Sequence, residues 1–245
     1  MEKEIISSRT NELVKKIKKL SERKYRTEFG EYVAEGKRWV TDASRICPQN
    51  IVAVVRAQSC DYEGANYILS DSLFAEISDT QNSQGILAIM KIPEAASDFG
   101  SDRLLLLDRI RDPGNMGTII RTAVAAGYTD IIAESCVDVF NPKVIRSSMT
   151  GILSANIFYD SDISAIKAIG YKLIAADITG ENVFTSKIPS GKICLVIGNE
   201  ANGISGEIMS ACDCKVSIPM EKGIESLNAA VSAGILMYEL KFKNN

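Results

Sequence analysis

Short apolar runs recur along the second half of the chain, and their composition predicts a parallel β-sheet. The runs are RLLLLD (103–108), TDIIAE (129–134), YKLIAAD (171–177), KICLVIG (192–198) and CKVSIP (214–219). They are apolar almost throughout, as expected of strands that are covered on both faces. Helical stretches separate them, and this alternation is typical of an α/β fold.

A smaller α/β unit is predicted ahead of this sheet. Apolar residues recur at helical spacing between residues 13 and 20, as Leu13, Ile17 and Leu20. The segments IVAVV (51–55), NYILS (66–70) and GILAIM (85–90) are typical of strands that are separated by helical or loop stretches.

The composition changes between the two parts. The segment IPEAASDFGSD (92–102) has the Pro, Gly, Ser and acidic residues of a linker. We therefore expect a first domain over residues 1–93, a linker over 94–102 and a second domain over 103–245.

The stretch DPGNMGTIIRTAVAAG predicts a helix that carries one permanent charge. Asp112 is placed to cap it, Pro113 suits its first position and Gly127 is placed to end it. Arg121 lies on the same face as Gly114, two turns back towards the preceding loop. An unpaired buried arginine is costly, so we expect Arg121 to face solvent, to be paired or to await an anion.

Three of the predicted strands end in loops that are rich in Gly, Asn and Pro, namely DRIRDPGNMG (108–117), GNEANGISG (198–206) and IPMEKGIESLN (218–228). In an open parallel sheet such loops meet at the carboxyl edge, where small ligands bind. The second loop imitates the glycine spacing of a P-loop, but Ile204 stands where the lysine is required, and no GxGxxG motif follows the first strand. Ordinary turn chemistry is the alternative for each loop, with Ser226 as an N-cap of the closing helix.

The three loops resemble the signature motifs of the SpoU, or TrmH-like, RNA ribose 2'-O-methyltransferases of the SPOUT superfamily. The segments that carry the resemblance are DPGNMGTIIRTAVAAG, LVIGNEANGIS and IPMEKGIESLNAAVSAGILMYE. The N-terminal segment from IISSRTNELV to EGKRWV is similar to the substrate-binding domain common in this family, so the resemblance covers nearly the whole chain.

The resemblance implies a fold, a cofactor and partners. The fold would be a SPOUT-type parallel sheet with a C-terminal trefoil knot, preceded by a small α/β RNA-binding domain like ribosomal protein L30e. The cofactor would be S-adenosyl-L-methionine (AdoMet), and the partners would be RNA and a second copy of the chain, bound through the catalytic domain. General rules of chain topology disfavour knots, so this feature depends on the resemblance alone.

The resemblance also implies the site residues. The catalytic set would be Asn115, Arg121, Glu200, Ser226 and Asn228. The cofactor pocket would be formed, largely by backbone groups, by Ala176, Gly198, Asn199, Ile218 and Leu227.

The roles within the catalytic set follow from their chemistry. Arg121 matches the arginine that the family is thought to use to activate the ribose hydroxyl, but a guanidinium keeps its proton in proteins. We therefore expect Arg121 to hold an RNA phosphate and to stabilise negative charge on the 2'-oxygen, while a phosphate oxygen or water takes the proton. Asn115 would bind the ribose or hold its loop, and Glu200 would either pair with Arg121 or fix the second loop.

The charge distribution points to an acidic partner. The chain carries a net charge of -3, yet its first 46 residues contain twelve Lys and Arg against eight Asp and Glu, which gives +4. The run KKIKKLSERKYR combines this positive charge with Tyr25, a pattern that suits phosphates and bases. The expected RNA-binding residues are Lys15, Lys16, Lys19, Arg23, Lys24 and Arg26. A solvated helix face is the alternative.

Other features exclude whole classes of chemistry. The chain has no histidine, and its six cysteines form no CxxC pair. We therefore expect no zinc or other metal site and no histidine-based triad, so a carboxylate, Lys, Tyr, Cys, water or the substrate must transfer protons. No apolar run approaches the ~18 residues of a membrane span, and the start of the chain lacks the apolar core of a signal peptide. We expect a cytoplasmic protein.

Together these features predict an AdoMet-dependent methyltransferase that acts on a ribose 2'-hydroxyl of RNA, with 23S-type ribosomal RNA as the expected substrate. Three alternatives stay open: transfer RNA as the substrate, a non-catalytic RNA-binding protein, and an enzyme for a small nucleotide-like molecule. Failure to bind AdoMet would favour the binding protein, and a salt-dependent RNA affinity would disfavour the small substrate.

Overall fold

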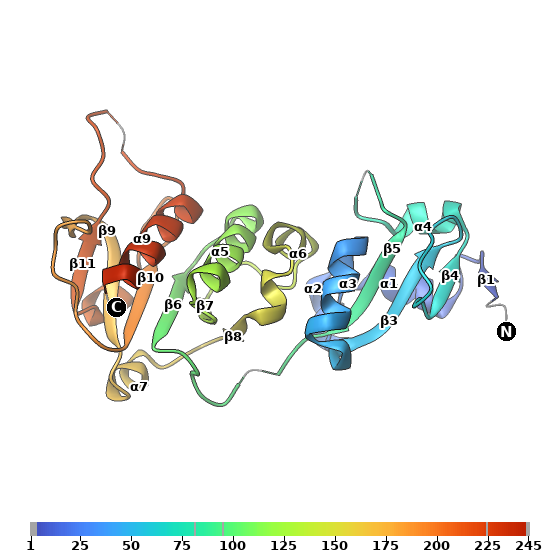
Figure 1. The fold of residues 1–245 in the computed structure, drawn as a ribbon, viewed down its shortest axis with the longest axis horizontal. Helices are drawn as coiled ribbons and strands as arrows, with labels where there is room; N and C mark the ends of the chain where they lie inside the picture. The colour runs from blue at the N-terminus through green and yellow to red at the C-terminus, as the bar shows by residue number, and fades with distance from the viewer. Residues whose placement is uncertain (1–3, 81, 95, 224, 244–245) are drawn as a thin grey trace. The chain divides into compact units, whose positions relative to one another are not determined.

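The computed structural model describes residues 4–80, 82–94, 96–223 and 225–243 and comprises two compact units, each built around its own sheet (Figure 1). The first unit contains residues 1–94 together with 140–153, and the second contains 95–139 together with 154–245.

The first unit is a mixed five-stranded sheet with helices. Its strand order is β1-β4-β3-β5-β2, in which β5 runs antiparallel to both of its neighbours. The strands are β1 (Ile5–Ile6), β2 (Glu31–Glu35), β3 (Ile51–Ala57), β4 (Tyr67–Leu69) and β5 (Ile86–Lys91). The helices are α1 (Glu12–Lys19), α2 (Arg23–Phe29), α3 (Lys37–Ile46), α4 (Asp71–Ile77), α6 (Pro142–Ser148) and the short 3-10 helices η1 (Pro48–Asn50) and η2 (Gly151–Ser154).

The periodicity of the first helix places its apolar residues correctly. Val14, Ile17 and Leu20 are fully or almost fully buried against β3, α4 and β5, and Leu13 packs at the edge of this core. The three strands expected from the sequence are β3, β4 and β5, whereas β1 and β2 were not expected. β1 spans only two residues, and β2 has only three apolar residues between two glutamates.

Helix α6 belongs to the first unit although it lies within residues 103–245. It packs on β2, and the ring of Phe140 lies 5.0 Å from that of Tyr32. The indole nitrogen of Trp39 on α3 donates a hydrogen bond to the Met149 carbonyl oxygen at 3.0 Å. The compact units therefore differ from the boundaries expected from composition, because a segment of the second half returns to the first sheet.

The second unit is a six-stranded parallel sheet of order β11-β9-β10-β6-β7-β8. Its strands are β6 (Arg103–Asp108), β7 (Asp130–Glu134), β8 (Asn156–Phe158), β9 (Lys172–Asn182), β10 (Ile193–Ile197) and β11 (Cys214–Ser217). Its helices are α5 (Pro113–Ala126), α7 (Ile163–Ala168), α8 (Gly206–Ala211) and α9 (Ala229–Lys243). All five strands expected here are present, and only the three-residue β8 was not expected.

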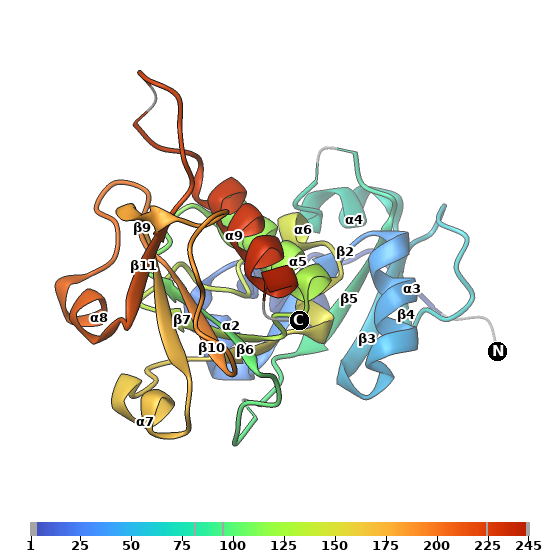
Figure 2. The same ribbon diagram turned by 60° about the vertical axis from the view of Figure 1, so that its left-hand side comes forward.

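Helices cover both faces of this sheet. Ile166 of α7 and Ile208 of α8 pack with Leu104 and Leu106 of β6. Because side chains alternate along a strand, Leu105 and Leu107 face the other side. Helices α5 and α9 lie side by side (Figure 2). The mixed α/β class with a parallel sheet is thus as expected, and the trefoil knot stays a prediction.

The ends of α5 are those expected from its sequence. The Asp112 side chain accepts a hydrogen bond from the Asn115 amide at 2.8 Å, and Pro113 is the first helical residue. Gly127 ends the helix in the left-handed conformation at φ 91°, which favours glycine. These local signals fix where the first loop ends and the helix begins.

All six cysteines are free thiols. Cys47 and Cys194 are buried, and the other four are half-buried. Within the described ranges, no cluster of Cys, Asp and Glu side chains is suited to hold a metal ion, and no helix in those ranges is long and apolar enough to cross a membrane.

We expect the free energy of unfolding to fall as the pH is raised above about 9. Burial raises the pKa of Cys136 from 9.0 to about 12, and it raises the pKa of Cys194 as well. Above pH 9 the thiols of the unfolded chain lose protons that the folded chain keeps, so alkali favours unfolding. Urea unfolding at increasing pH measures this slope. Cys136→Ser should flatten it, and a slope that is equal in the two proteins would contradict the assignment.

Candidate functional site

A pocket of about 510 Å³ lies at the carboxyl edge of the parallel sheet, a size typical of small-molecule sites. Its walls come from the ends of β9, β10 and β11, from the loops that follow β10 and β11, and from the start of α9. The lining residues are Ala176, Asp177, Ile178, Ile197, Gly198, Asn199, Glu200, Ala201, Gly203, Val216, Ser217, Ile218, Met220, Glu225, Ser226, Leu227, Ala229, Ser232 and Leu236.

The residues expected to hold the cofactor lie together here. Ala176, Gly198, Asn199, Ile218 and Leu227 all line the pocket, although they come from three separate segments of the chain. Two residues of the expected catalytic set, Glu200 and Ser226, line it as well.

The second loop, residues 198–206, folds tightly on itself. The backbone N–H of Asn199 donates to the Gly203 carbonyl oxygen at 3.0 Å, and the N–H of Gly203 donates back at 2.9 Å. The Asn199 side-chain oxygen accepts from the amides of Ala201 and Asn202 at 3.0 and 3.1 Å. Gly203 has φ 61°, so glycine is favoured at this bend. The loop is therefore held in a tight turn by its own backbone and by the Asn199 side chain.

A buried carboxylate joins this loop to the end of β6. Asp108 is 1% exposed, and it accepts hydrogen bonds from the Ser205 amide at 2.6 Å and from Arg109 Nε at 3.0 Å. Arg109 has φ 57°, and its Nη2 donates to the Gly203 carbonyl oxygen at 3.3 Å. The Arg109 carbonyl oxygen accepts from Asn199 Nδ2 at 2.9 Å. We call Asp108 and Arg109 the loop clamp, since together they contact three positions of the loop.

Side-chain amides join all three loops. Asn228 Nδ2 donates to Asn115 Oδ1 at 2.9 Å, and Asn115 Nδ2 donates to Glu200 Oε1 at 2.7 Å. The three loops therefore meet at one point, as their position after parallel strands predicts. Of the two roles expected for Glu200, the structure shows the one that fixes the second loop, because its carboxylate accepts from Asn115.

The third loop decides against one of the alternatives, that Ser226 serves as the N-cap of the closing helix. Helix α9 begins at Ala229, and Asn228 Oδ1 accepts from the Ala230 amide at 2.9 Å. Asn228, and not Ser226, therefore caps this helix. Ser226 is exposed at the pocket wall instead.

Arg121 stands apart from the other catalytic candidates. It is exposed on α5, six residues beyond Asn115, which corresponds to about 9 Å along the helix axis. It makes no hydrogen bond or ion pair with the residues that the structure describes, and it does not line the pocket. Arg121 was expected to face solvent, to be paired or to await an anion. In the single chain it faces solvent, so its guanidinium is available to an anion.

The expected RNA-binding residues lie on α1 and α2 of the first unit. Lys15, Lys19, Arg23 and Lys24 are exposed, and Lys16 is half-buried. Arg26 is 3% exposed and donates from Nη1 to the carbonyl oxygens of Leu20 and Ser21 at 2.8 and 2.7 Å. The assignment of Arg26 to RNA was wrong, because its guanidinium is used to join the two helices.

Some residues of the site gave no recognised signal in the sequence. The loop clamp was missed because Asp108 ends an apolar run and Arg109 begins a loop, so neither stands out by spacing. Asp177, Met220 and Ser232 of the pocket were missed as well. A buried carboxylate directly after a parallel strand, facing a glycine-rich loop, is the signal that was available for Asp108.

Family models match both parts of the chain. The SpoU rRNA Methylase family matches residues 102–238, and the MRM3-like substrate binding domain matches residues 11–88. The chain belongs to the SpoU rRNA Methylase family. The three loops and the residues that line the pocket all lie within the match to the SpoU rRNA Methylase family.

Relatives and solved structures agree with this membership over the full length. The chain is 31% identical to 23S rRNA (guanosine(2553)-2'-O)-methyltransferase RlmP of Bacillus subtilis, across 96% of this chain and 98% of that protein. An AdoMet-bound rRNA methyltransferase from Sinorhizobium meliloti has a similar structure, with TM-score 0.86, 27% identity, and coverage of 98% and 97%. The SpoU methyltransferase AviRb from Streptomyces viridochromogenes, in complex with AdoMet, gives TM-score 0.81, 27% identity, and coverage of 95% and 98%.

Proposed function

We propose that this protein transfers the methyl group of AdoMet to a ribose 2'-hydroxyl of ribosomal RNA. The observation that carries the proposal is the meeting of three loops at one pocket, where Asn115 bonds both Glu200 and Asn228. The AdoMet-bound SpoU structures and the 23S rRNA methyltransferase among the relatives support the same chemistry.

The pocket fits AdoMet in size and in charge. Its backbone-rich wall around Gly198 and its apolar side chains suit an adenosine group, and Asp177, Glu200 and Glu225 supply acidic side chains. A hydrogen bond from the Thr179 hydroxyl holds the pKa of Asp177 below its ordinary value, so this carboxylate stays ionised at neutral pH. Acidic groups favour a cationic ligand, and AdoMet, when bound, supplies a methyl group on a positively charged sulfur.

The protein's own residues would position the RNA and stabilise charge. A neutral 2'-hydroxyl is a weak nucleophile, so accurate placement accounts for much of the barrier lowering. Asn115, which Glu200 and Asn228 hold in place, would hydrogen-bond the ribose. Arg121 would bind the adjacent phosphate through its forked donors and stabilise the 2'-oxygen as it loses its proton to a phosphate oxygen or to water.

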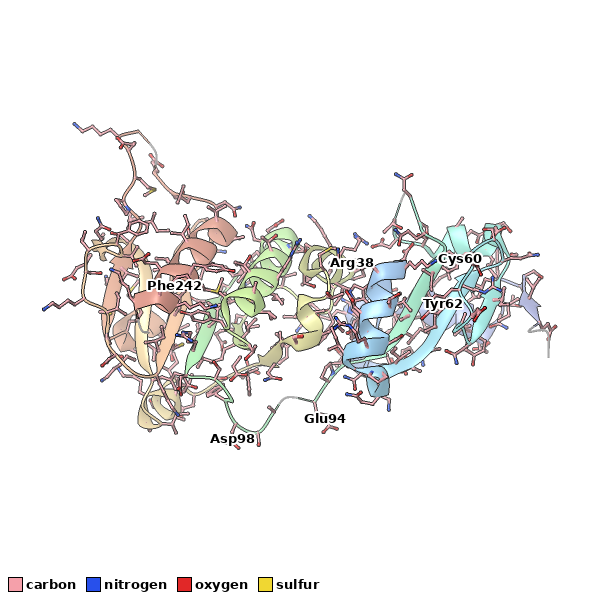
Figure 3. All side chains as sticks on the ribbon, viewed as in Figure 1. Arg38, Cys60, Tyr62, Glu94, Asp98 and Phe242 are labelled. Atoms are coloured by element: carbon pink, nitrogen blue, oxygen red, sulfur yellow. The ribbon has the colours of Figure 1, made fainter. Side chains whose placement is uncertain are left out.

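We further propose that this protein acts on 23S-type ribosomal RNA, in the cytoplasm and as a homodimer. Similarity to RlmP supports 23S-type ribosomal RNA as the substrate. Helix α9 exposes Val231, Tyr238 and Phe242 by 52%, 40% and 70%, and Phe242 lies near the end of the helix (Figure 3). An apolar helix surface of this kind favours a homodimer. Because α5 packs beside α9, Arg121 would then lie near the subunit boundary.

Labelled methyl transfer tests the function directly. The full chain, incubated with methyl-labelled AdoMet and either ribosomal or transfer RNA, should label ribosomal RNA. A 2'-O-methyl group protects the neighbouring phosphodiester from alkali, so the label should persist in an alkali-resistant dinucleotide. Label on a base, or label confined to transfer RNA, would contradict the proposal, and AdoMet binding without any transfer would favour the non-catalytic reading.

Asp108→Asn should weaken AdoMet binding about tenfold and lower the free energy of unfolding by about 1 to 3 kcal/mol. The amide removes the negative charge opposite Arg109 and places a second donor near the Ser205 amide, so the loop clamp opens. Calorimetric titration with AdoMet and urea unfolding measure the two effects. Asp102→Asn, at an exposed position ahead of the same strand, is the control. Wild-type AdoMet affinity in the Asp108 variant would exclude the loop clamp from a role in the pocket.

A further inference from the structure

Two aromatic side chains of α2 stack on each other at the surface of the first unit. Tyr25 and Phe29 are one helical turn apart, with ring centroids 6.1 Å apart and an angle of 18° between the planes. Phe29 is 36% exposed and Tyr25 is half-buried. A flat, accessible ring is the surface on which an unpaired base stacks, and such stacking tolerates any base.

Three lysine ammonium groups lie against these rings. Lys19 Nζ is 5.2 Å and Lys24 Nζ is 5.5 Å from the centroid of Tyr25, and Lys16 Nζ is 5.7 Å from that of Phe29. These distances are within the range of cation–π attraction. We call these five residues the Tyr25 platform.

The charges around the platform are only partly neutralised. Lys16 is held by Glu31 at 2.6 Å, which orients it over Phe29. Among the residues that the structure describes, Lys24 has no acidic partner. Lys19 makes no ion pair there, although its charge adds to that of Lys15 in lowering the pKa of Glu12. Lysine stems are flexible, so these ammonium groups can leave the ring for a phosphate while a base takes their place.

We propose that the Tyr25 platform binds unpaired nucleotides of the RNA substrate. A base stacks on the Tyr25 and Phe29 rings, and Lys19 and Lys24 contact the flanking phosphates. This inference rests on the RNA of the proposed function and adds that the first unit selects exposed, unstacked bases. Paired RNA offers no free base face, because its bases are stacked inside an A-form helix.

Binding of short labelled RNAs to the full chain tests the platform. We expect an unpaired oligonucleotide to bind more tightly than a blunt duplex of the same length. Tyr25→Ala and Phe29→Leu should each weaken binding of the unpaired RNA about tenfold, because each removes a stacking surface. Tyr25→Phe keeps the ring and should bind like the wild type.

The salt dependence separates stacking from charge. Lys19→Ala and Lys24→Ala should each reduce the slope of log affinity against log salt by roughly 0.7, the value for one phosphate contact on a single strand. The two aromatic variants should lower affinity at every salt concentration without changing the slope. Ultraviolet cross-linking should attach the unpaired RNA to a peptide that contains Tyr25 or Phe29.

Matched controls keep the outcomes distinct. Tyr67→Ala removes another exposed tyrosine of the first unit, and it should bind RNA like the wild type. Thermal unfolding of every variant shows whether it folds, and Tyr25→Phe covers the case in which Tyr25→Ala does not. Equal binding of Tyr25→Ala, Phe29→Leu and the wild type, or a wild-type preference for the duplex, would overturn the inference.

Methyl transfer and RNA binding test the proposed function and the Tyr25 platform independently. Platform-dependent RNA binding without methyl transfer from AdoMet would contradict the function and leave the platform intact. Methyl transfer by the wild type, together with an RNA affinity that Tyr25→Ala and Phe29→Leu do not change, would contradict the platform and leave the function intact.

Discussion

Replacing Arg121 by lysine should lower turnover about a hundredfold or more while AdoMet binding stays close to that of the wild type. Arg121 is exposed on α5, outside the pocket lining, so its loss removes nothing from the cofactor. Lysine keeps the charge but has no planar fork, and it cannot hold a phosphate through two parallel hydrogen bonds. Single-turnover methyl transfer to RNA and calorimetric titration with AdoMet measure the two quantities.

The same arginine-to-lysine substitution at a position outside the site provides the control. Arg38 on α3 has a side chain that is 80% exposed, and it lies in the first unit (Figure 3). Arg38→Lys should leave turnover unchanged. Wild-type turnover in Arg121→Lys would show that a simple positive charge suffices, and equal losses of turnover and AdoMet affinity would place Arg121 in the cofactor site instead.

Local sequence signals predicted the parts of the fold that short segments decide by themselves. Helix α5 begins and ends where Asp112, Pro113 and Gly127 require it. Most strands of the second unit were recognised as short, mainly apolar runs, with residues 104–107 of β6 and 193–197 of β10 as the clearest cases. Strands β2 and β8 were not expected, because a short strand acquires its pairing from neighbours distant in the sequence.

Long-range contacts explain what local signals missed. The return of α6 to the first sheet depends on packing against β2, and no composition change marks it. Arg26 has the same local sequence character as its basic neighbours, yet its guanidinium meets the carbonyl oxygens of Leu20 and Ser21. The pattern of charges along a chain predicts a basic surface, but it does not tell which of the basic side chains are exposed and which are buried.

The meeting of the three loops followed from the order of the elements in the sequence. Loops after parallel strands meet at one edge of the sheet whatever their sequence, so finding the loops was sufficient to bring Asn115, Glu200 and Asn228 together. What joins the loops to the sheet was missed, because the role of Asp108 depends on the backbone amide of Ser205. Side chains that act on distant backbone leave no periodic pattern in the sequence.

Gly198→Ala should abolish AdoMet binding and lower the free energy of unfolding by at least about 2 kcal/mol. A Cβ at position 198 would overlap the Gly203 carbonyl carbon and the Ile204 nitrogen and lie 2.6 Å from the Gly203 carbonyl oxygen. These are backbone atoms of the second loop, which closes on itself through Asn199 and Gly203. They cannot rotate away, so the loop must move and carry the pocket wall with it.

Gly206→Ala isolates the steric cause of this effect. Gly206 begins α8, three residues beyond the pocket residue Gly203, and a Cβ there meets nothing within 4 Å. Neither Gly198 nor Gly206 has a positive φ, so alanine causes no backbone strain at either position. Alanine at 206 should therefore leave AdoMet affinity and urea unfolding at wild-type values. If both variants bind AdoMet normally, the close approach of residue 198 to Gly203 has no part in forming the pocket, and the wall must be adaptable rather than held by its backbone.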